Sequence, residues 1–403
     1  MQHLLDLELA DCLQVGAAAA RLRQQLAALI GEEAHGLGST RIDAEHMHSD
    51  DNGIPLTFSE ARRVLADAVT ARAFPAAVVE VGDATRPLWS EAFGRLTFDA
   101  AAAPAEPDTV FDLASLTKVL ATTPLVMQLV ERGGIALDDR VSRHLAEWWG
   151  DDRATVTIRD LLAHCSGLPA YRPLYLRDRG DAAFARVISS LALAYPPGSR
   201  SIYSDLDFML LGFILGGSTQ LPDRLTALLR QMGVVDPLQF HPPALWARRI
   251  APTAYDAWRG RMLSGDVDDL NAWALGGAAG HAGLFGTASA VGAFARHLLQ
   301  VLDERVGAFS RSTLIKFISR RDDVAGSSRA LGWDTMLPTS SCGTRMSPRA
   351  FGHTGYTGTS LWIDPDRGMY VVLLTNRVYP DHMNNAIATV RPALHDAVIG
   401  AFR

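Results

Sequence analysis

The sequence predicts an α/β fold of the α+β type, in which an antiparallel sheet is built from both ends of the chain and flanked by helices, with a helical insertion domain between the two strand groups. Two observations predict it. Runs with strand character lie at about residues 74–110 and again at about 330–380, whereas the region from about 115 to 325 is mostly helical in pattern. This order suits a sheet with helices packed against it and a cleft between the two.

Each strand group contains a hairpin signal. The runs AAVVEVGD and PLWSEAFGRL flank a turn predicted at Gly82-Asp83, and the runs TSLWIDP and MYVVLLTN flank turn residues 364–368. A final helix is expected over residues 383–401.

The first 55 residues differ from the rest of the chain. Leucines recur at helical spacing over residues 4–30 and Gly31 ends the pattern, which predicts one long helix or a pair of helices. Residues 35–55 are polar and rich in Gly, His and Asp, as in a linker. We therefore expect a helical extension and linker over 1–55, which covers one side of the cleft or forms a homodimer contact, and a main domain over 56–403.

Composition limits the classes of function. The 403 residues suit one large domain or two interleaved domains. The net charge of −6 supplies no basic face for a phosphate backbone, so a nucleic-acid partner is not expected. The three cysteines, Cys12, Cys165 and Cys342, are widely spaced, which argues against a disulfide framework or a zinc site.

The N-terminal stretch MQHLLDLELADCLQV has acidic residues among its apolar ones and no arginine before Arg21, unlike a secretory signal. We expect a cytoplasmic location on this ground. No window of about 18 residues is both uncharged and strongly apolar, so no membrane span is predicted.

Lysine is rare in this chain. Of the 38 lysine and arginine residues, only Lys118 and Lys316 are lysines. Arginine stays protonated, whereas a lysine can act as a base. In the stretch FDLASLTKVL, Lys118 follows Ser115 by three residues, so the two are a candidate base and nucleophile. The alternative interpretation is a serine helix cap followed by a solvated lysine.

The apolar run after Ser115 predicts a helix that stops at Gly133-Gly134. Residues three apart share a helix face, so Lys118 would lie beside Ser115. The positive end of the helix dipole would favour a serine alkoxide and a neutral lysine. Pro124 lies too deep to occupy the first helical position, so a kink or restart is expected there.

Two further stretches carry candidate site residues. In YPPGSRSIYSDLDFMLLG, Tyr203 and Asp205 precede an apolar helix, and a phenol near an ammonium can serve as acid and base. Alternatively, Asp205 caps the helix and Tyr203 only packs. In FGHTGYTGTSLWIDP, the N–H after Gly355 can stabilise an oxyanion, and glycines allow close approach of a ligand. The alternative there is a β-bulge with a surface histidine, His353.

Ser-x-x-Lys, Tyr-Ser-Asp after Pro-Pro-Gly, and His-Thr-Gly on a late strand stand here in the order typical of serine β-lactamases and penicillin-binding proteins. The chain resembles the branch that contains class C β-lactamases, D-alanyl-D-alanine peptidases and related esterases over about residues 75–380. LLAHCSGLPAYRPLY at 161–175 and GGAAGHAGLFGTA at 276–288 are similar to accessory segments of that family.

The resemblance implies a β-lactamase/transpeptidase-like fold and a reaction through an acyl-enzyme, with no metal or organic cofactor. It implies that Ser115 is the nucleophile, Lys118 the base that activates it, and Tyr203 the proton shuttle to the leaving group. The backbone N–H groups of Ser115 and Tyr356 would form the oxyanion hole. The other candidate substrate-binding residues are Asp205, His353, Thr354 and Gly355.

Two positions depart from the family pattern. His353 stands where many relatives carry lysine, and a largely neutral imidazole attracts a substrate carboxylate less strongly. Asp205 stands where penicillin-recognising relatives carry asparagine, and a carboxylate would hold Lys118 protonated if the two met. Both departures predict weak or absent β-lactamase activity. They resemble the ester- and cell-wall-peptide-cleaving members, including the N-acetylmuramoyl-L-alanine amidase branch.

The expected function is therefore a serine hydrolase whose small-molecule substrate is an ester or an amide, such as a muropeptide fragment. An acyltransferase on the same scaffold and a non-catalytic binding or assembly protein are the alternatives. The stretch AEHMHSDDN at 44–52 offers metal-ligand residue types but no strand end to hold them rigid, so no metal site is predicted. His164 and His281 are expected to be hydrogen-bonded structural residues.

Overall fold

The computed structural model describes residues 57–305 and 307–402. The predicted helical extension and linker over 1–55, with the histidines and aspartates at 44–52, lie outside the described residues. Residues Leu56–Arg403 form one compact unit.

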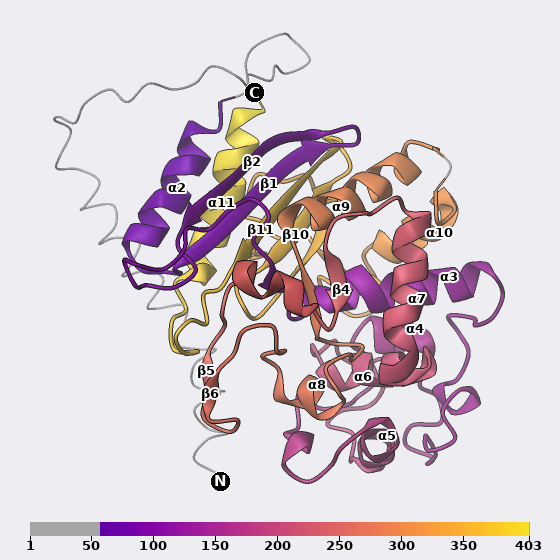
Figure 1. The fold of residues 1–403 in the computed structure, drawn as a ribbon. Helices are drawn as coiled ribbons and strands as arrows, with labels where there is room; N and C mark the ends of the chain where they lie inside the picture. Colours follow the sequence, from indigo (N-terminus) through magenta and orange to yellow (C-terminus); the bar gives the residue numbers. More distant parts are fainter. Residues whose placement is uncertain (1–56, 306, 403) are drawn as a thin grey trace, which may run out of the picture. The chain divides into compact units, whose positions relative to one another are not determined.

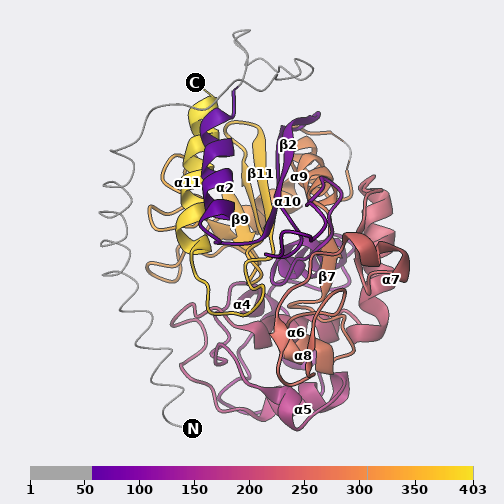
Figure 2. The same ribbon diagram turned by 60° about the vertical axis from the view of Figure 1, so that its left-hand side comes forward.

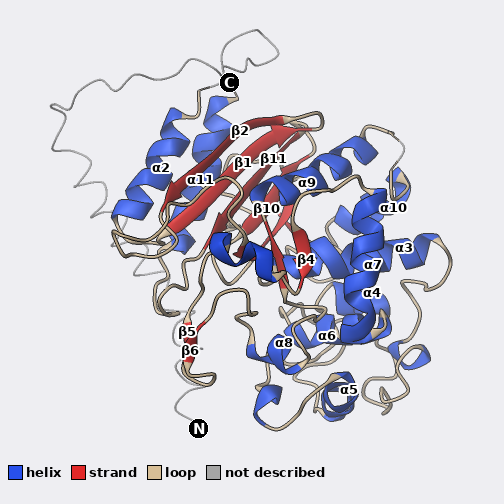
Figure 3. Ribbon diagram, in the orientation of Figure 1, coloured by secondary structure: helices blue, strands red, loops and turns tan. Residues whose placement is uncertain are grey.

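The centre of this unit is a six-stranded antiparallel sheet with the strand order β2-β1-β11-β10-β9-β8 (Figures 1 and 3). Strands from the two ends of the unit meet in the middle, where β1 pairs with β11 and Val79 lies opposite Leu373. The predicted sheet from both chain ends is therefore confirmed. The strands are β1 (Ala76–Asp83), β2 (Pro87–Gly94), β8 (Asp334–Thr335), β9 (Phe351–Thr354), β10 (Ser360–Asp364) and β11 (Met369–Thr375).

Both faces of the central strands are buried, because their sequences are almost continuously apolar. Alternate residues belong to two separate cores: Val78 packs on one face and Val79 on the other. Helices α2 (Ser59–Thr70) and α11 (Ile387–Ala401) lie side by side over the face that buries Val79 (Figure 2). Helix α9 (Ala288–Leu302) covers the opposite face, against β1 and β11.

Two predicted boundaries are wrong by a few residues. Strand β1 runs through Gly82-Asp83, and the turn follows at 84–86, where the Asp83 carboxylate accepts the backbone N–H groups of Thr85 and Arg86. Gly82 marks an irregularity in the β1–β2 register, and the Tyr370 side chain occupies the space that a Cβ on residue 82 would need. The final helix begins at Ile387 rather than at 383, after a turn.

The regular structure between the two strand groups is mainly helical, as predicted, although loops connect its short elements, and the region lies beside one end of the sheet (Figures 1 and 3). A three-stranded sheet of order β3-β7-β4 and a β5–β6 hairpin complete it. The helices are α3 (Thr123–Glu131), α4 (Ile158–Leu162), α5 (Asp181–Ser190), α6 (Asp205–Ile214), α7 (Gly217–Gln231), α8 (Leu270–Ala274) and α10 (Arg311–Ile318). The short strands are β3 (Phe111–Asp112), β4 (Leu238–Phe240), β5 (Tyr255–Asp256), β6 (Arg261–Met262) and β7 (Leu284–Gly286).

The predicted helix after Ser115 is interrupted where Pro124 indicated. A five-residue π-helix, Lys118–Thr122, is followed directly by α3, whose second residue is Pro124. Proline has no N–H to donate and its ring crowds the carbonyl four residues earlier, so a wider turn relieves the conflict. The wide turn lies at the base of the candidate site and buries Lys118 completely.

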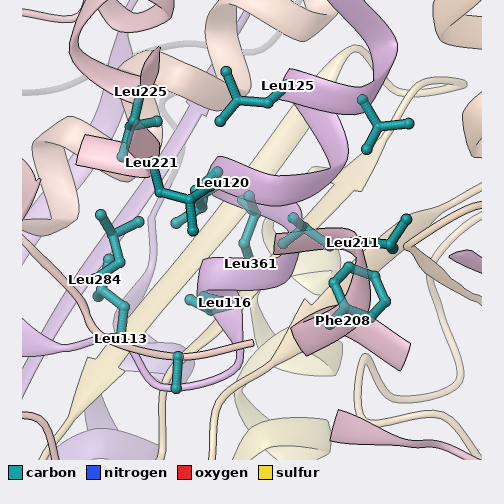
Figure 4. Packing of buried hydrophobic residues seen from close by; sticks show 14 of the residues in the cluster. Leu113, Leu116, Leu120, Leu125, Phe208, Leu211, Leu221, Leu225, Leu284 and Leu361 are labelled. Carbon is teal, nitrogen blue, oxygen red and sulfur yellow. The ribbon is translucent and has the colours of Figure 1, made fainter. Parts of the chain in front are cut away.

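A dense apolar core fixes the segment that carries Ser115 and Lys118. Leucines from this segment interdigitate with residues of α6, α7, β7 and β10 (Figure 4). The labelled members of this core are Leu113, Leu116, Leu120, Leu125, Phe208, Leu211, Leu221, Leu225, Leu284 and Leu361. Within the described part of the chain, no helix has the length and apolarity that crossing a bilayer requires.

Candidate active site

Ser115 lies in a constrained turn between β3 and the following helix. Ala114, the residue before it, has a φ of +46°, in the left-handed region that residues with a Cβ rarely adopt. The Asp112 carboxyl group supports this conformation by accepting the Ala114 N–H at 2.8 Å. The turn therefore holds the serine side chain in one place rather than letting it continue a regular helix.

Lys118 lies one helical turn after Ser115, as the spacing predicted. Its ammonium donates to Ser115 Oγ at 2.9 Å, to the Asp205 carboxylate at 2.7 Å and to the His281 carbonyl at 3.2 Å. The lysine side chain has no solvent exposure, whereas that of Asp205 is 20% exposed. The alternative of a solvated lysine is therefore wrong.

Tyr203 approaches the same serine from a segment 88 residues away. Its hydroxyl donates to Ser115 Oγ at 2.8 Å, and Lys118 Nζ lies 4.8 Å from the centre of its ring. His164 holds this segment in place because its carbonyl accepts the Ile202 N–H and its Nδ1 accepts the Ser204 N–H. His164 is thus a hydrogen-bonded structural residue, as expected.

The protonation states follow from these contacts. Burial lowers the pKa of Lys118, but the Asp205 carboxylate and Tyr203 outweigh it, so the pKa of the lysine is raised above its ordinary value. Burial also raises the pKa of Tyr203 above its ordinary value, against the pull of the Lys118 charge. At neutral pH both groups carry their protons, and Ser115 Oγ accepts two hydrogen bonds.

The third motif lies at the end of β9, beside Tyr203. His353 is 3% exposed, which contradicts the alternative of a surface histidine. Its Nδ1 lies 2.8 Å from the Thr354 carbonyl, so this nitrogen carries the proton and Nε2 is an acceptor. Its ring centre is 5.8 Å from that of Tyr203. Burial and the Arg329 and Lys118 charges hold the pKa of His353 well below its usual range, so the imidazole is neutral.

The backbone after His353 runs against the turn that carries Ser115. A Cβ on residue 355 would collide with the Leu113 carbonyl, which explains the glycine. Hydroxyls that follow it join the two segments: Thr357 donates to the Asp112 carbonyl and Thr359 to the Leu113 carbonyl.

Both predicted oxyanion-hole donors lack a hydrogen-bond acceptor within the described residues. Neither the Ser115 N–H nor the Tyr356 N–H donates to any group within the described residues. The Gly355 carbonyl, by contrast, is held by Arg391, whose guanidinium donates to it at 2.7 Å. Tyr356 itself points its ring outward, where Arg377 lies 4.4 Å from the ring centre. The two N–H groups are thus available to a carbonyl oxygen.

A second polar cluster lies behind the Ser115 turn and was missed by the sequence reasoning. The Asp112 carboxyl group accepts the Asp268 N–H at 2.7 Å as well as the Ala114 N–H. Burial, together with neighbouring carboxylates, raises the pKa of Asp112 to about 7 and that of Asp268 to about 7. The signal that could have found Asp112 is a lone carboxylate in the apolar run FDLASL.

His281 connects this second cluster to Lys118. Its Nε2 lies 3.0 Å from Asp269 Oδ1, while its carbonyl accepts from the lysine. The expectation of a structural, hydrogen-bonded histidine is met. Asp269 also accepts the Ala272 N–H and so caps α8. In the part of the chain that the structure describes, no group of three or more His, Cys, Asp or Glu side chains is arranged to hold a metal ion.

Arg329 is the other residue near the site that sequence reasoning missed. Its guanidinium carbon lies 5.2 Å from the centre of the Tyr203 ring. It belongs to no motif, and nothing in its sequence neighbourhood distinguishes it from the other arginines.

Of the residues that the sequence predicted for the site, Ser115, Lys118, Tyr203 and Asp205 form one hydrogen-bonded group. The segment His353–Tyr356 lies beside this group.

Comparison with known proteins gives the family. A sequence profile of the beta-lactamase family matches residues 61–394. Curated relatives include a protein of Salmonella agona (strain SL483) described as "Putative D-alanyl-D-alanine carboxypeptidase", which is 34% identical over 313 residues. That match covers 68% of this chain and 70% of the relative.

Solved structures share the fold at low sequence identity. EstCE1, described as a hydrolase with promiscuous acyltransferase activity, superposes with a TM-score of 0.68 at 20% identity, covering 85% of this chain and 98% of that one. A class C β-lactamase from Rhodobacter sphaeroides gives 0.66 at 19% identity, with 85% and 99% covered. A penicillin-binding protein homologue from Caulobacter crescentus gives 0.67 at 21% identity, with 85% and 97% covered.

The fold, the order of the three motifs and the family match agree with one another. The chain belongs to the β-lactamase family and is an enzyme of its serine hydrolase class.

Proposed function

We propose that this protein cleaves small esters or amides, muropeptide fragments among them, through an acyl-enzyme on Ser115. The observation that carries the proposal is the convergence of Lys118 and Tyr203 on Ser115 Oγ, at 2.9 Å and 2.8 Å. A serine with a lysine and a phenol within hydrogen-bond distance has the partners that nucleophilic catalysis requires.

The first step needs a neutral Lys118. In that state Nζ accepts the proton of the Ser115 hydroxyl while Oγ forms a bond to the substrate carbonyl carbon. The carbonyl oxygen becomes an anion, and the unpaired N–H groups of Ser115 and Tyr356 are the donors that would stabilise it. Because Asp205 favours the charged lysine, acylation should be faster at alkaline pH.

Collapse of the intermediate breaks the bond to the leaving group. The Tyr203 hydroxyl gives its proton to the departing oxygen or nitrogen, and the Lys118 ammonium returns a proton to Tyr203. Water then attacks the acyl-enzyme, with the same two side chains taking and returning its proton. Every proton that leaves one partner is thus received by another within the cluster.

Two features support a preference for esters and peptides over β-lactams. Asp205 is an acceptor that is already engaged with Lys118, so it does not offer the donor that an asparagine would give to a β-lactam side-chain amide. His353 is neutral and offers no ammonium to the β-lactam carboxylate. The Salmonella relatives described as D-alanyl-D-alanine carboxypeptidases support a peptide substrate. A cytoplasmic location and a homodimer stay predictions.

The test is chemical labelling together with turnover. Wild-type protein should form a fluorophosphonate adduct on Ser115 and hydrolyse p-nitrophenyl esters, with little turnover of nitrocefin. Ser115→Ala should lose both the adduct and the hydrolysis, whereas Ser190→Ala, at the exposed end of α5, should keep them. Equal turnover by wild type and Ser115→Ala on every hydrolysed substrate would refute the proposal, and a folded protein without any adduct would favour a binding protein.

A second candidate is acyl transfer to an alcohol or amine in place of water. The observation that favours it is the structural likeness to EstCE1, which is described as having promiscuous acyltransferase activity. Adding alcohol acceptors during ester turnover should then yield a new ester at the expense of the free acid. If the free acid remains the only product at every acceptor concentration, hydrolysis alone stands.

A further inference from the structure

Arg391, on α11, is a buried arginine without a counter-charge. The residue is 9% exposed, and one guanidinium nitrogen donates to the Gly355 carbonyl at 2.7 Å and to the Thr359 carbonyl at 2.9 Å. Within the described part of the chain, no carboxylate lies at ion-pair distance from Arg391, and its Nε has no hydrogen-bond partner. Burial and the Arg377 charge lower the pKa of Arg391 to about 9, so it keeps its proton at neutral pH. A buried charge without a partner costs stability, which points to a role other than folding.

The carbonyl that Arg391 holds belongs to the peptide group that carries one of the two oxyanion donors. The Gly355 carbonyl and the Tyr356 N–H are the two ends of one trans peptide, so they point in opposite directions. The same carbonyl also accepts the Gly358 N–H at 3.1 Å, which closes a tight turn around Tyr356. By fixing the carbonyl on the side of α11, the guanidinium fixes the direction of the N–H on the other side.

A charged donor at the carbonyl also changes the strength of the N–H as a donor. Hydrogen bonds in a chain polarise one another, and a bond from an ionised donor is about twice as strong as one between neutral groups. A peptide whose carbonyl accepts from a guanidinium therefore carries a more positive N–H proton, which binds an anion more strongly. Because Arg391 has no carboxylate beside it among the described residues, no opposite charge weakens this effect on the Gly355–Tyr356 peptide.

Two neighbouring peptide groups show what is particular to this contact. In the peptide that carries the Ser115 N–H, the Ala114 carbonyl accepts the Thr117 N–H at 3.0 Å and the Thr117 hydroxyl at 2.7 Å, and both donors are neutral. The next peptide after Gly355–Tyr356 has a charged donor, since Arg377 Nε donates to the Tyr356 carbonyl at 2.7 Å, but its N–H belongs to Thr357. Among the described arginines, only Arg391 thus places a charge on a peptide that carries an oxyanion donor.

We propose that Arg391 is a positioning residue of the oxyanion hole: its guanidinium orients and polarises the Gly355–Tyr356 peptide, so that the Tyr356 N–H stabilises the anion that forms on the substrate carbonyl. This inference rests on the proposed function and adds to it a residue that acts through a peptide group rather than on the reacting atoms. The added stabilisation is largest when the carbonyl oxygen becomes an anion, so Arg391 should raise kcat rather than tighten the binding of substrate.

The experiment compares an activated ester with its thionoester, in which sulfur replaces the carbonyl oxygen. Sulfur is a weak hydrogen-bond acceptor, so a weaker oxyanion hole slows the ester more than the thionoester. In Arg391→Gln, kcat for the ester should fall about ten-fold with KM little changed, and the ester-to-thionoester ratio of kcat/KM should fall about five-fold or more. Arg391→Lys keeps a charge near the carbonyl and should recover part of the loss. Arg391→Met has the same expected result as Arg391→Gln and replaces it if that variant does not fold.

Two other arginines are the matched controls. Arg377→Gln removes a guanidinium from the same turn without affecting the donor to the Gly355 carbonyl, and Arg230→Gln removes an exposed one from the last turn of α7. The ester-to-thionoester ratio should stay at the wild-type value in both. An unchanged ratio in Arg391→Gln, or an equal fall in Arg377→Gln, would overturn the proposal. Circular dichroism in the near ultraviolet verifies that each variant keeps its packing.

A spectroscopic measurement separates this inference from the proposed function. Protein labelled with ¹⁵N-tyrosine has eight labelled backbone amides, and Tyr356→Phe identifies the signal of Tyr356. The ¹⁵N chemical shift of an amide responds to hydrogen bonding at the carbonyl of the same peptide, so Arg391→Gln should move the Tyr356 signal more than that of any other tyrosine. A moved signal in a protein that hydrolyses no ester supports the action of Arg391 on the peptide, although the proposed function then fails. A Tyr356 signal that stays in place overturns the inference whatever the turnover.

Discussion

Two carboxyl groups lie close to the Ser115 turn: Asp205 contacts Lys118, and Asp112 contacts Ala114. Their surroundings differ. Asp205 lies 2.7 Å from an ammonium and is partly exposed. Asp112 lies buried against the backbone of Asp268. Burial and the nearby Asp268 raise the pKa of Asp112 to about 7, and burial and the nearby Asp269 raise that of Asp268 to about 7. The comparison teaches that the partner and the burial, rather than the residue type, decide whether a carboxyl near this serine holds a proton.

The largest expected effect comes from replacing Lys118, whose ammonium pairs with Asp205. Lys118→Arg keeps the positive charge but removes the group that can give up a proton, so kcat/KM for an activated ester should fall by about 10²–10⁴-fold. Lys316→Arg, which changes the only other lysine of the chain, is the control and should keep wild-type kinetics. If Lys118→Arg kept the wild-type kcat/KM, Lys118 would have no part in the proton transfer.

A smaller effect is expected when the carboxylate beside the ammonium is neutralised. In the wild type, Asp205 raises the pKa of Lys118 against the effect of burial, so activity should rise with pH as the lysine loses its proton. Asp205→Asn should move this rise to lower pH. The activity at pH 7, relative to the alkaline plateau, should then increase about ten-fold. The measurement is the pH profile of kcat/KM, and a profile that does not move would contradict the coupling between the two side chains.

The third expected effect is on stability rather than on rate, and it concerns the buried pair Asp112 and Asp268. The pKa of Asp268 is raised from 3.8 to about 7 in the folded protein, so the folded state binds more protons than the unfolded state between these values. The free energy of unfolding should therefore fall as pH rises from about 4 to about 7, and the loss should persist above that.

Asp268→Asn removes the carboxyl group whose pKa is raised. The decrease in the free energy of unfolding between low and neutral pH should therefore be smaller than in the wild type by about 1–3 kcal/mol. Urea unfolding at pH 4.5 and pH 8 measures it. Asp303→Asn, an exposed carboxylate after α9, is the control and should follow the wild type. A wild-type protein that is more stable at pH 8 than at pH 4.5, with no difference from Asp268→Asn, would contradict the assignment of neutral carboxyls.

The parts of the site that depend on local geometry could be predicted from the sequence. Ser115 and Lys118 meet because residues three apart share a helix face, and Pro124 indicated the break that follows. Tyr203 and the His353 segment were placed by resemblance to a family. The two strand pairs were predicted from their runs of strand-forming residues. The turn of the second pair lies where it was predicted, whereas the turn of the first pair was misplaced by a few residues.

The parts that depend on long-range packing could not be predicted. Arg329 reaches Tyr203 from a segment more than one hundred residues away in sequence, and no local pattern separates an unpaired arginine from a paired one. The backbone N–H of Asp268 reaches the Asp112 carboxyl group from 156 residues away in sequence, and no local pattern indicates that contact. The contact between Asp205 and Lys118 was expected only on the condition that the segments meet. The segment that carries Lys118 and helix α6, which begins at Asp205, come together because both pack into the same apolar core.

The pairing of β1 with β11 has a consequence for biosynthesis. The Ala76 N–H donates to the Asn376 side chain 300 residues later, next to the point where the two strands join. At about 5–20 residues per second, a ribosome releases β1 roughly 15–60 s before β11 emerges. Throughout that interval β1 has β2 beside it and nothing on its other edge, so the nascent chain presents an apolar strand edge on which chaperones can act and at which aggregation can start.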